Sequence, residues 1–335
     1  MGGGPSTPTL AAAVSAAGGF GFLAAGYRSP DALRDDIRAV RAETDRPFGV
    51  NVFVPSPRAD VGDSVERYAA ALRREAERYG VPLGEPRHDD DAWGEKLVLL
   101  AEERVAVVAF TFGCPDAAVV EELHATGAAV WVTVTTAAEA IVAEGAGADA
   151  LVVQGVEAGG HRGSFDDDAP GEIGLIALLQ LVRDAVDLPL VAAGGLATGR
   201  GVAAVLAAGA DAAALGTGFM LTSEAGTSAA HREALTGRSG TALTRAFTGR
   251  TARGIVNRFL REHDAAAPSA YPEVHHLTAP LRAAAREGGD AEGFHLWAGQ
   301  AHTLTDELPA GELVRRLGEE AREALREAAG RLGDR

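Results

Sequence analysis

Hydrophobic and polar positions alternate regularly along the first two thirds of the chain. Runs rich in β-branched or aromatic residues predict seven strands, at 19–26, 48–54, 105–112, 129–135, 150–155, 189–195 and 212–220. Amphipathic, alanine-rich stretches between them predict helices near 8–17, 30–44, 64–79, 116–126, 136–146, 173–186 and 199–209. Strands that alternate with helices in this way are typical of βα units and a parallel sheet.

The number of strands and two late glycine-rich turns indicate the architecture. Seven strands are one short of a closed barrel, and GGGPSTP at the start of the chain has the pattern of a loop that enters a helix with no strand before it. Barrels place phosphate sites in the loops after strands seven and eight, which matches the two glycine-rich turns. We therefore predict an α/β fold, a (β/α)8 TIM barrel that lacks its first strand, with a doubly wound open sheet as the rival.

The alternation stops near residue 222, and the rest of the chain predicts two further regions. Residues 1–222 form the barrel in this interpretation. Residues 223–285, which contain Pro268, Pro272 and Pro280, predict a mostly helical cap beside the barrel mouth that contributes to the substrate region. Residues 286–335 predict C-terminal helices that pack back on the barrel.

Charge and cysteine content narrow the class of protein and partner. Lys and Arg number 31 against 47 Asp and Glu, a formal net charge of −16 with no basic block, which argues against nucleic acid as a partner. A single cysteine, no secretory leader pattern and no run of about 20 apolar residues argue against secretion and membrane insertion. We expect a cytoplasmic protein with a small-molecule partner. The sequence is compatible with a homodimer.

The segment QGVEAGGHRG, residues 154–163, follows a predicted buried strand and is the strongest candidate for chemistry. Barrel enzymes place their reacting groups at this end of the strands. The glycines let the backbone approach a ligand closely, and the loop displays His161. An imidazole with an ordinary pKa of about 6.5 can take a proton from an acidic carbon at neutral pH. A histidine that only binds the backbone is an equally good interpretation.

Amides and backbone N–H groups make up a second set of candidates. Gln154, and Asn51 at the end of another predicted strand, each offer donor and acceptor atoms. The segments VAAGGLATGRG and ALGTGF place consecutive N–H groups after successive strands, and such groups can bind a phosphate dianion without a lysine. The residues concerned are Gly194 and Gly195 in the first segment and Ala214, Leu215, Gly216 and Thr217 in the second.

Other polar residues carry weaker interpretations. Arg200 can add a charge to the phosphate turns or lie on the surface, and Glu157 can assist His161 or be solvated. Cys114 has no demonstrable histidine partner, so we predict a buried or loop thiol. The adjacent His275 and His276 are interpreted as solvated. Since the histidines lack the spacing of metal ligands, no metal site is predicted.

Several motifs taken together resemble those of a known family. GGGPSTPTLAAAVSAAGGFGFLAAGY, FGVNVF, QGVEAGGHRG, AAGGLATGRGVAAVLAAGA, LGTGF and LWAGQ occur in the order and spacing of the nitronate monooxygenases, also called 2-nitropropane dioxygenases. The resemblance extends over nearly the whole chain. The family's strand and Ala-Pro-Met type turn ahead of the first glycines are absent here. Ala214 stands where the family usually has Gln, and Gly218 where it has a larger residue, often Arg.

The resemblance implies FMN at the C-terminal mouth of the barrel. It implies oxidation of alkyl nitronates, such as propionate 3-nitronate, or of nitroalkanes, with O₂, to a carbonyl compound and nitrite. In this reading His161 is the catalytic base or stabilises the bound anion. The implied FMN contacts are Asn51, Gln154, Gly159, Gly194, Gly195, Ala214, Leu215, Gly216 and Thr217.

Two alternatives to this function stay open. Related flavin barrels act as NAD(P)H-dependent reductases of quinones or enoyl thioesters, and the EAGGH loop does not separate them from the monooxygenases. The absent first strand also leaves room for a non-catalytic flavin-binding protein.

Overall fold

The chain folds around a sheet of seven parallel strands. The computed structural model describes residues 1–56 and 61–333. The strands run in the order β1-β2-β3-β4-β5-β7-β8, so neighbours in this sheet follow one another along the chain, apart from β6, which lies in a second sheet. All seven predicted strands are confirmed: β1 (Phe22–Ala24), β2 (Gly49–Phe53), β3 (Val107–Thr111), β4 (Ala129–Val134), β5 (Ala150–Gln154), β7 (Leu190–Ala193) and β8 (Ala212–Ala214).

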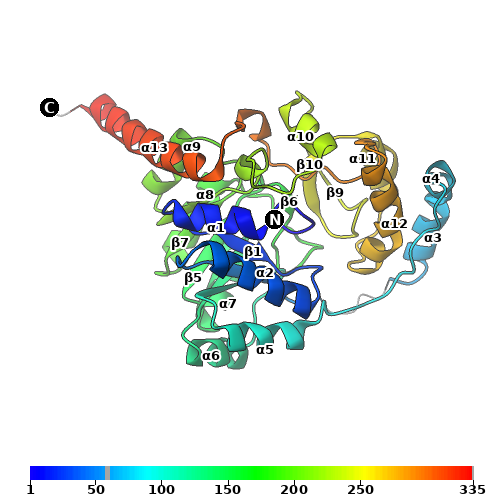
Figure 1. Ribbon diagram of the computed structural model, residues 1–335, viewed down its shortest axis with the longest axis horizontal. Helices are drawn as coiled ribbons and strands as arrows, with labels where there is room; N and C mark the ends of the chain where they lie inside the picture. Colours follow the sequence, from blue (N-terminus) through cyan, green and yellow to red (C-terminus); the bar gives the residue numbers. More distant parts are fainter. Residues whose placement is uncertain (57–60, 334–335) are drawn as a thin grey trace.

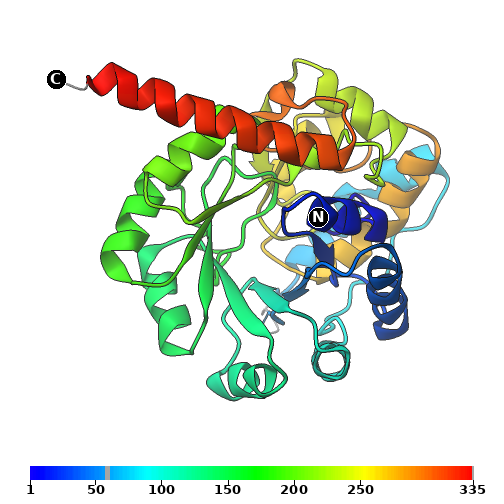
Figure 2. The same ribbon diagram turned by 60° about the vertical axis from the view of Figure 1, so that its left-hand side comes forward.

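The sheet curls into an open barrel with helices on its outer side (Figure 2). Its two edges are β1 and β8, which do not pair with each other within the described residues. The sequential strand order rules out the doubly wound alternative, in which the order reverses in mid-sheet. The prediction of a TIM barrel that lacks one strand is therefore confirmed.

Most helices begin and end close to their predicted positions. These are α1 (Pro8–Ala16), α2 (Pro30–Glu43), α6 (Ala117–Ala125), α7 (Ala137–Gly145), α8 (Leu175–Ala185) and α9 (Gly199–Ala207). The predicted helix at 64–79 is two helices, α3 (Ser64–Ala71) and α4 (Arg73–Tyr79). The helix that covers the sheet between β2 and β3 is instead α5 (Trp93–Glu103), which the sequence analysis did not identify.

The region after β8 holds both helices and a second sheet. The helices are α10 (Ala229–Thr236), α11 (Arg258–His263) and α12 (Glu273–Glu287), with short 3-10 turns η1 (Thr217–Phe219), η2 (Asp264–Ala266) and η3 (His302–Leu304). Strands β9 (Thr241–Thr244) and β10 (Ala252–Ile255) form an antiparallel sheet with β6 (Gly160–His161), in the order β6-β10-β9. This sheet was not predicted, and it joins the loop that carries His161 to the cap.

Helices α3 and α4 belong to the cap rather than to the barrel wall. They lie beside α12, away from the parallel sheet (Figure 1). Tyr68 and Leu72 share a buried apolar cluster with Val274, Leu277 and Leu281 of α12. The chain between β2 and α5 therefore leaves the barrel, packs on the cap and returns.

The last helix, α13 (Ala310–Leu332), packs against α9 and α1. Its Leu313 and Leu317 are buried with Leu10 and Phe219. A Cβ on Gly199 of α9 would lie 2.3 Å from Cβ of Glu320, so the two helices approach closely there. None of the helices in the described part of the chain has both the length and the apolar character that crossing a membrane demands.

The strands have two faces with different environments. Val50, Val108, Val130 and Leu151 are each 0 % exposed and pack under the outer helices. Their neighbours along each strand point to the inner side, because side chains alternate in a β-strand. The polar positions of the strands therefore face inward, where they border the candidate site.

Candidate functional site

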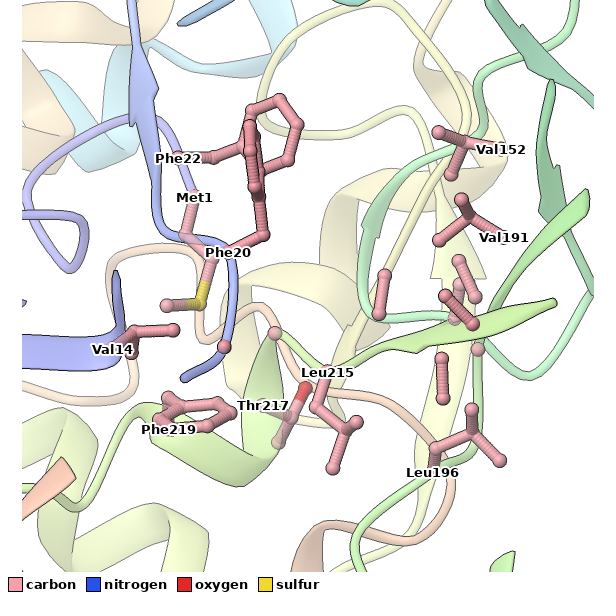
Figure 3. A pocket seen from close by; sticks show the side chains of 18 of the residues that line it. Met1, Val14, Phe20, Phe22, Val152, Val191, Leu196, Leu215, Thr217 and Phe219 are labelled. Atoms are coloured by element: carbon pink, nitrogen blue, oxygen red, sulfur yellow. The ribbon is translucent and has the colours of Figure 1, made fainter. Parts of the chain in front are cut away.

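The inner face of the parallel sheet borders a cavity of about 770 Å³. Figure 3 shows part of its wall, with Phe20 and Phe22 on one side and Val152 and Val191 on the other. Trp131 stacks on Phe20 with ring centroids 5.6 Å apart. Most of this surface is apolar, so the polar groups that open onto it are few and specific.

The structure brings together every residue for which the sequence predicts an FMN contact. They come from separate segments, at the carboxyl ends of β2, β5, β7 and β8 and in the loops that follow them. All of them line the one cavity: Asn51, Gln154, Gly159, Gly194, Gly195, Ala214, Leu215, Gly216 and Thr217.

The two glycine-rich turns lie side by side because their strands are paired. Ala193 of β7 is opposite Ala214 of β8, and each turn starts directly after that pair. Gly194 and Gly195 have φ values of +118° and +67°, which other residues adopt only with strain. A Cβ on Gly195 would also lie 2.9 Å from Cβ of Glu157. Glycine is therefore required at this turn by conformation and by space.

Backbone N–H groups of the two turns are available to a ligand. The N–H groups of Gly195, Gly216 and Thr217 donate to no other residue within the described ranges. The first N–H of α9, that of Gly199, is instead taken by Glu320 Oε2 at 3.0 Å. No arginine or lysine lines this cavity in the described chain. A phosphate at these turns would therefore meet main-chain donors and no cationic side chain of the described residues.

Asn51 is oriented by its neighbours in the sheet. Its Oδ1 accepts a hydrogen bond from Thr111 Oγ1 at 2.9 Å, and Thr111 lies 3.3 Å from Thr133 Oγ1 on the next strand. Because the oxygen of the amide is occupied, its NH₂ group is left for the cavity. Three adjacent strands thus present Asn51 as a donor.

Besides its predicted contact with FMN, Gln154 makes hydrogen bonds within its own loop that the sequence did not predict. Its Oε1 accepts from Arg162 Nη1 at 3.0 Å and from Gly163 N at 2.8 Å, and its Nε2 donates to the His161 carbonyl at 3.1 Å. Arg162 is fully buried and also donates to the Gly155 carbonyl at 2.7 Å. Gln154 and Arg162 together fix the loop that presents His161. Sequence reasoning missed Arg162, because an arginine in a loop next to a histidine more often faces solvent.

Gly159 is constrained by another segment of protein. A Cβ there would lie 2.4 Å from the backbone N of Gly299, and Gln300 N donates to the Glu157 carbonyl at 3.0 Å. The segment around Gly299 therefore closes over this loop. Part of the requirement for glycine at position 159 comes from this close approach rather than from a ligand.

A second cavity, of about 530 Å³, adjoins the first and contains His161. The two share Asn51, Gln154, Gly159, Gly216 and Thr217 as lining residues. Aromatic rings surround the imidazole, whose centroid is 5.4 Å from that of Trp297 and 5.6 Å from that of Phe112. The candidate site thus has a lower chamber inside the barrel and an upper chamber under the cap.

The imidazole of His161 is held by one hydroxyl and kept neutral by its surroundings. Nε2 lies 2.9 Å from Thr248 Oγ1, and that hydroxyl is 3.2 Å from the Arg250 carbonyl. Burial, followed by the charges of Arg250 and Arg282, lowers the pKa of His161 to about 3. The ordinary pKa assumed from the sequence therefore does not apply here. No sequence motif pointed to Thr248, which is distant along the chain.

Other residues singled out from the sequence lie elsewhere or differ in role. Both carboxylate oxygens of Glu157 accept from Leu175 N at the start of α8, at 3.0 and 3.1 Å, so Glu157 caps that helix. The Arg200 side chain is 77 % exposed and pairs with Glu327, away from the cavity. Cys114 is partly buried, and burial raises the pKa of its thiol to about 11.

The interpretation of the histidine pair as solvated is wrong. The ring of His275 stacks on Tyr27 with centroids 4.2 Å apart and lines the upper chamber. His276 Nε2 lies 2.6 Å from Asp89 Oδ2. Both residues sit on α12, whose packing against the chamber could not be read from their spacing alone.

One cluster elsewhere has the composition of a metal site. Glu75, Glu262 and His263 bring ligand atoms within 4.8 Å of one another. Arg258 Nη1, however, lies 2.7 Å from Glu75 and 2.8 Å from Glu262. Because the guanidinium already neutralises both carboxylates, the cluster is an ion-pair network within the cap.

Comparison with known proteins gives one consistent result. The family model described as nitronate monooxygenase matches residues 1–320. A protein of Pseudomonas aeruginosa named nitronate monooxygenase is 43 % identical over 331 residues, covering 95 % of this chain and 94 % of the relative.

Two solved structures share the fold of this chain. A nitroalkane oxidase from Streptomyces ansochromogenes has 54 % sequence identity and a TM-score of 0.95, covering 98 % of this chain and 95 % of that one. FabK from Thermotoga maritima has 30 % identity and a TM-score of 0.77, covering 97 % and 92 % of the two chains.

Proposed function

Because the chain belongs to the nitronate monooxygenase family, an oxidoreductase family, we propose that it binds FMN and oxidises alkyl nitronates or nitroalkanes with O₂ to a carbonyl compound and nitrite. The observation that carries the proposal is the pair of adjacent turns whose N–H groups open into the lower chamber, next to the chamber that contains His161. Propionate 3-nitronate is the substrate expected from the family resemblance.

The residues present fit FMN in size, polarity and donor set. The N–H groups of Gly195, Gly216 and Thr217 would hold the phosphate, and the Asn51 and Gln154 amides would face the polar edge of the ring. Gly159, Gly194, Ala214 and Leu215 would complete the contacts. Bound FMN supplies the electron acceptor for substrate oxidation.

The chain's own residues bind the substrate and handle its proton. His161 is neutral at neutral pH, so its imidazole can accept a proton from a nitroalkane or donate a hydrogen bond to a nitronate. The Thr248 hydroxyl can serve both cases, because it either accepts from Nε2 or donates to it. With a pKa of about 3, the free imidazole is a weak base. Preformed nitronates are therefore expected to be the better substrates.

The three predicted regions have corresponding roles in this proposal. Residues 1–222 hold FMN, and residues 223–285 cover the substrate chamber. The described part of residues 286–335 adds Phe294 and Trp297 to the wall of that chamber and then returns to the barrel as α13. The excursion that contains α3 and α4 joins the cap. The enzyme acts in the cytoplasm on small molecules, without nucleic acid or membrane partners.

The test is purification, a visible absorption spectrum and an assay of nitrite from an alkyl nitronate in air. The proposal expects a flavin spectrum, nitrite release and O₂ consumption. The similarity to FabK keeps an NAD(P)H-dependent reductase as the second candidate. Rapid anaerobic bleaching of the flavin by NADPH would favour that reductase and contradict the oxygenase. Bound flavin without turnover of either kind would indicate a non-catalytic flavin-binding protein.

A further inference from the structure

Arginines are the only charged side chains that line the upper chamber among the described residues. In a protein with a formal net charge of −16, no Asp or Glu lines this chamber within the described residues. Two arginines, Arg282 and Arg286, and the four histidines His161, His231, His275 and His295 do line it. The positive charges of this chamber have no carboxylate beside them on its wall. An anionic ligand is therefore favoured, because it would supply the missing negative charge.

Helix α12 places Arg282 in this chamber. His275, Ala279, Arg282 and Arg286 recur at helical spacing and line the chamber. The opposite face of the helix is buried in the cap core, as the 0–1 % exposure of Val274, Leu277 and Leu281 shows. The helix is therefore fixed in rotation, and the position of Arg282 follows from packing.

The Arg282 guanidinium is buried with part of its donor set unused. The residue is 7 % exposed, Nε donates to Thr278 Oγ1 at 2.9 Å, and Nη2 donates to the His275 carbonyl at 2.7 Å. Nη1 makes no hydrogen bond to any described residue, and no described carboxylate forms an ion pair with Arg282. Arg162, by contrast, satisfies Nε, Nη1 and Nη2 with carbonyl and amide oxygens.

A second donor lies close to this guanidinium. Tyr27 lines the same chamber and stacks on His275, to which Arg282 Nη2 also approaches within 3.3 Å. The Tyr27 hydroxyl accepts from Tyr271 at 3.1 Å, so its own proton is left to donate. Burial raises the pKa of Tyr27 to about 12, which keeps that proton in place at neutral pH.

The Tyr27 backbone is also held in place. Its φ of +64° is in the left-handed region, and its N–H donates to Asp91 Oδ1 at 3.1 Å. Asp91 pairs in turn with Lys96 at 2.7 Å. A non-glycine residue is kept in this conformation only where its surroundings enforce it, and such residues gather at ligand sites.

We propose that Arg282, assisted by Tyr27, binds a planar anion with two oxygens on one centre and so determines which substrates the enzyme accepts. The nitronate group and a carboxylate group share this geometry, so one oxygen can accept from Arg282 Nη1 and the other from the Tyr27 hydroxyl. This inference rests on the proposed function for the identity of the reacting group. Arg282 is a specificity residue that contacts the substrate anion, in the same chamber as His161.

The kinetic test compares three substrates in the wild type and in Arg282→Met. The substrates are a neutral nitroalkane, the alkyl nitronate derived from it, and propionate 3-nitronate. If Arg282 holds the nitronate group, KM rises by about 10- to 100-fold for both nitronates, the usual effect of losing a hydrogen bond to a charged group. If it holds the carboxylate, the rise is confined to propionate 3-nitronate. An equal change for the neutral nitroalkane, or no change for any substrate, overturns the proposal.

Two further variants distinguish the effect of the Arg282 charge from that of its planar shape and from general effects of removing an arginine. Arg282→Lys keeps the charge but loses the planar fork, so it recovers part of the lost affinity. Arg261→Met is the control, since this side chain is 57 % exposed on α11 and should leave every KM unchanged. Flavin content and melting temperature must match the wild type for all variants that are compared.

A binding measurement keeps this inference separate from the proposed function. The holoenzyme is melted in sodium propionate or sodium nitrate and in sodium chloride at equal ionic strength. A rise in Tm with the planar anions in the wild type and Arg261→Met, but not in Arg282→Met, supports the anion site even if no nitrite is ever released. The same response in wild type and Arg282→Met overturns it.

Discussion

His161 lies in surroundings that change the chemistry expected of a histidine. A loop imidazole with an ordinary pKa would be half protonated near pH 6.5. Burial and two buried arginines instead lower its pKa to about 3. The ring is neutral throughout the physiological range, and an anion bound beside it would raise its pKa again. The substrate thus helps to set the proton affinity of the group that acts on it.

Replacing His161 with asparagine separates its two roles. Asparagine keeps a hydrogen-bond donor for a bound nitronate but cannot take a proton. We expect His161→Asn to retain FMN and to lower kcat/KM for neutral nitroalkanes by about 10²- to 10⁴-fold. The value of kcat/KM for preformed nitronates should change far less. Steady-state nitrite assays with both substrate forms measure the difference. An equal loss for the two forms would contradict a role in proton transfer.

At the scale of single elements, the turn after β7 depends on backbone conformation. Gly195 has a φ of +67°, and a Cβ there would lie 2.9 Å from Glu157. We expect Gly195→Ala to destabilise the fold by about 1–2 kcal/mol and to weaken FMN binding, because the turn must shift. Thermal melts and flavin titration of the apoprotein measure both effects.

Gly145→Ala is the matched control for this prediction. Gly145 ends α7, and a Cβ there meets nothing within 4 Å. This variant should be neutral or slightly stabilising and should bind FMN as the wild type does. FMN affinity that is unaltered in Gly195→Ala would indicate that the turn does not contact the cofactor.

The loop between β5 and α8 depends on a single buried cation. Arg162 is 0 % exposed and satisfies backbone carbonyls of its own loop as well as Gln154. We expect Arg162→Met to cost about 3–5 kcal/mol in the free energy of unfolding, because these acceptors are left without a partner. Chemical denaturation measures this loss. A change below about 1 kcal/mol would show that water replaces the guanidinium.

The elements that the sequence predicts are those with a strong local pattern. All seven parallel strands and the helices that cover them, except α5, follow from hydrophobic periodicity. The antiparallel strands β9 and β10 are four residues each. They are stabilised by pairing of β10 with β6 on one side and with β9 on the other, which periodicity cannot detect. Asn51, Gln154 and His161 could be located from strand ends, whereas Arg162, Thr248 and Arg282 acquire their roles only through tertiary contacts.

At the scale of the whole molecule, the upper chamber links stability to pH. Burial lowers the pKa of His231 to about 4 and that of His275 to about 2, in addition to that of His161. The unfolded chain binds protons on these groups near pH 6.5, while the folded chain does not. Their contribution to stability is therefore complete above pH 6.5 and is lost as pH falls towards 4.

We expect the free energy of unfolding, and with it Tm, to decrease steadily from pH 7 to pH 5. Each buried histidine contributes at most about 1.4 kcal/mol per pH unit to this decrease. The substitution His231→Asn should reduce this slope. Melts across this pH range measure the slope, and identical slopes in wild type and His231→Asn would refute the linkage.

The barrel, the cap and the C-terminal helix enclose two joined chambers, one with free backbone donors and one with cations around a neutral imidazole. The proposed oxidation requires that the lower chamber binds the flavin phosphate. The most direct measurement is the visible absorption of the purified protein after incubation with FMN and removal of the unbound excess. We predict that about one FMN per chain stays bound after the excess is removed and gives a flavin spectrum. The absence of bound flavin in a folded protein would contradict it.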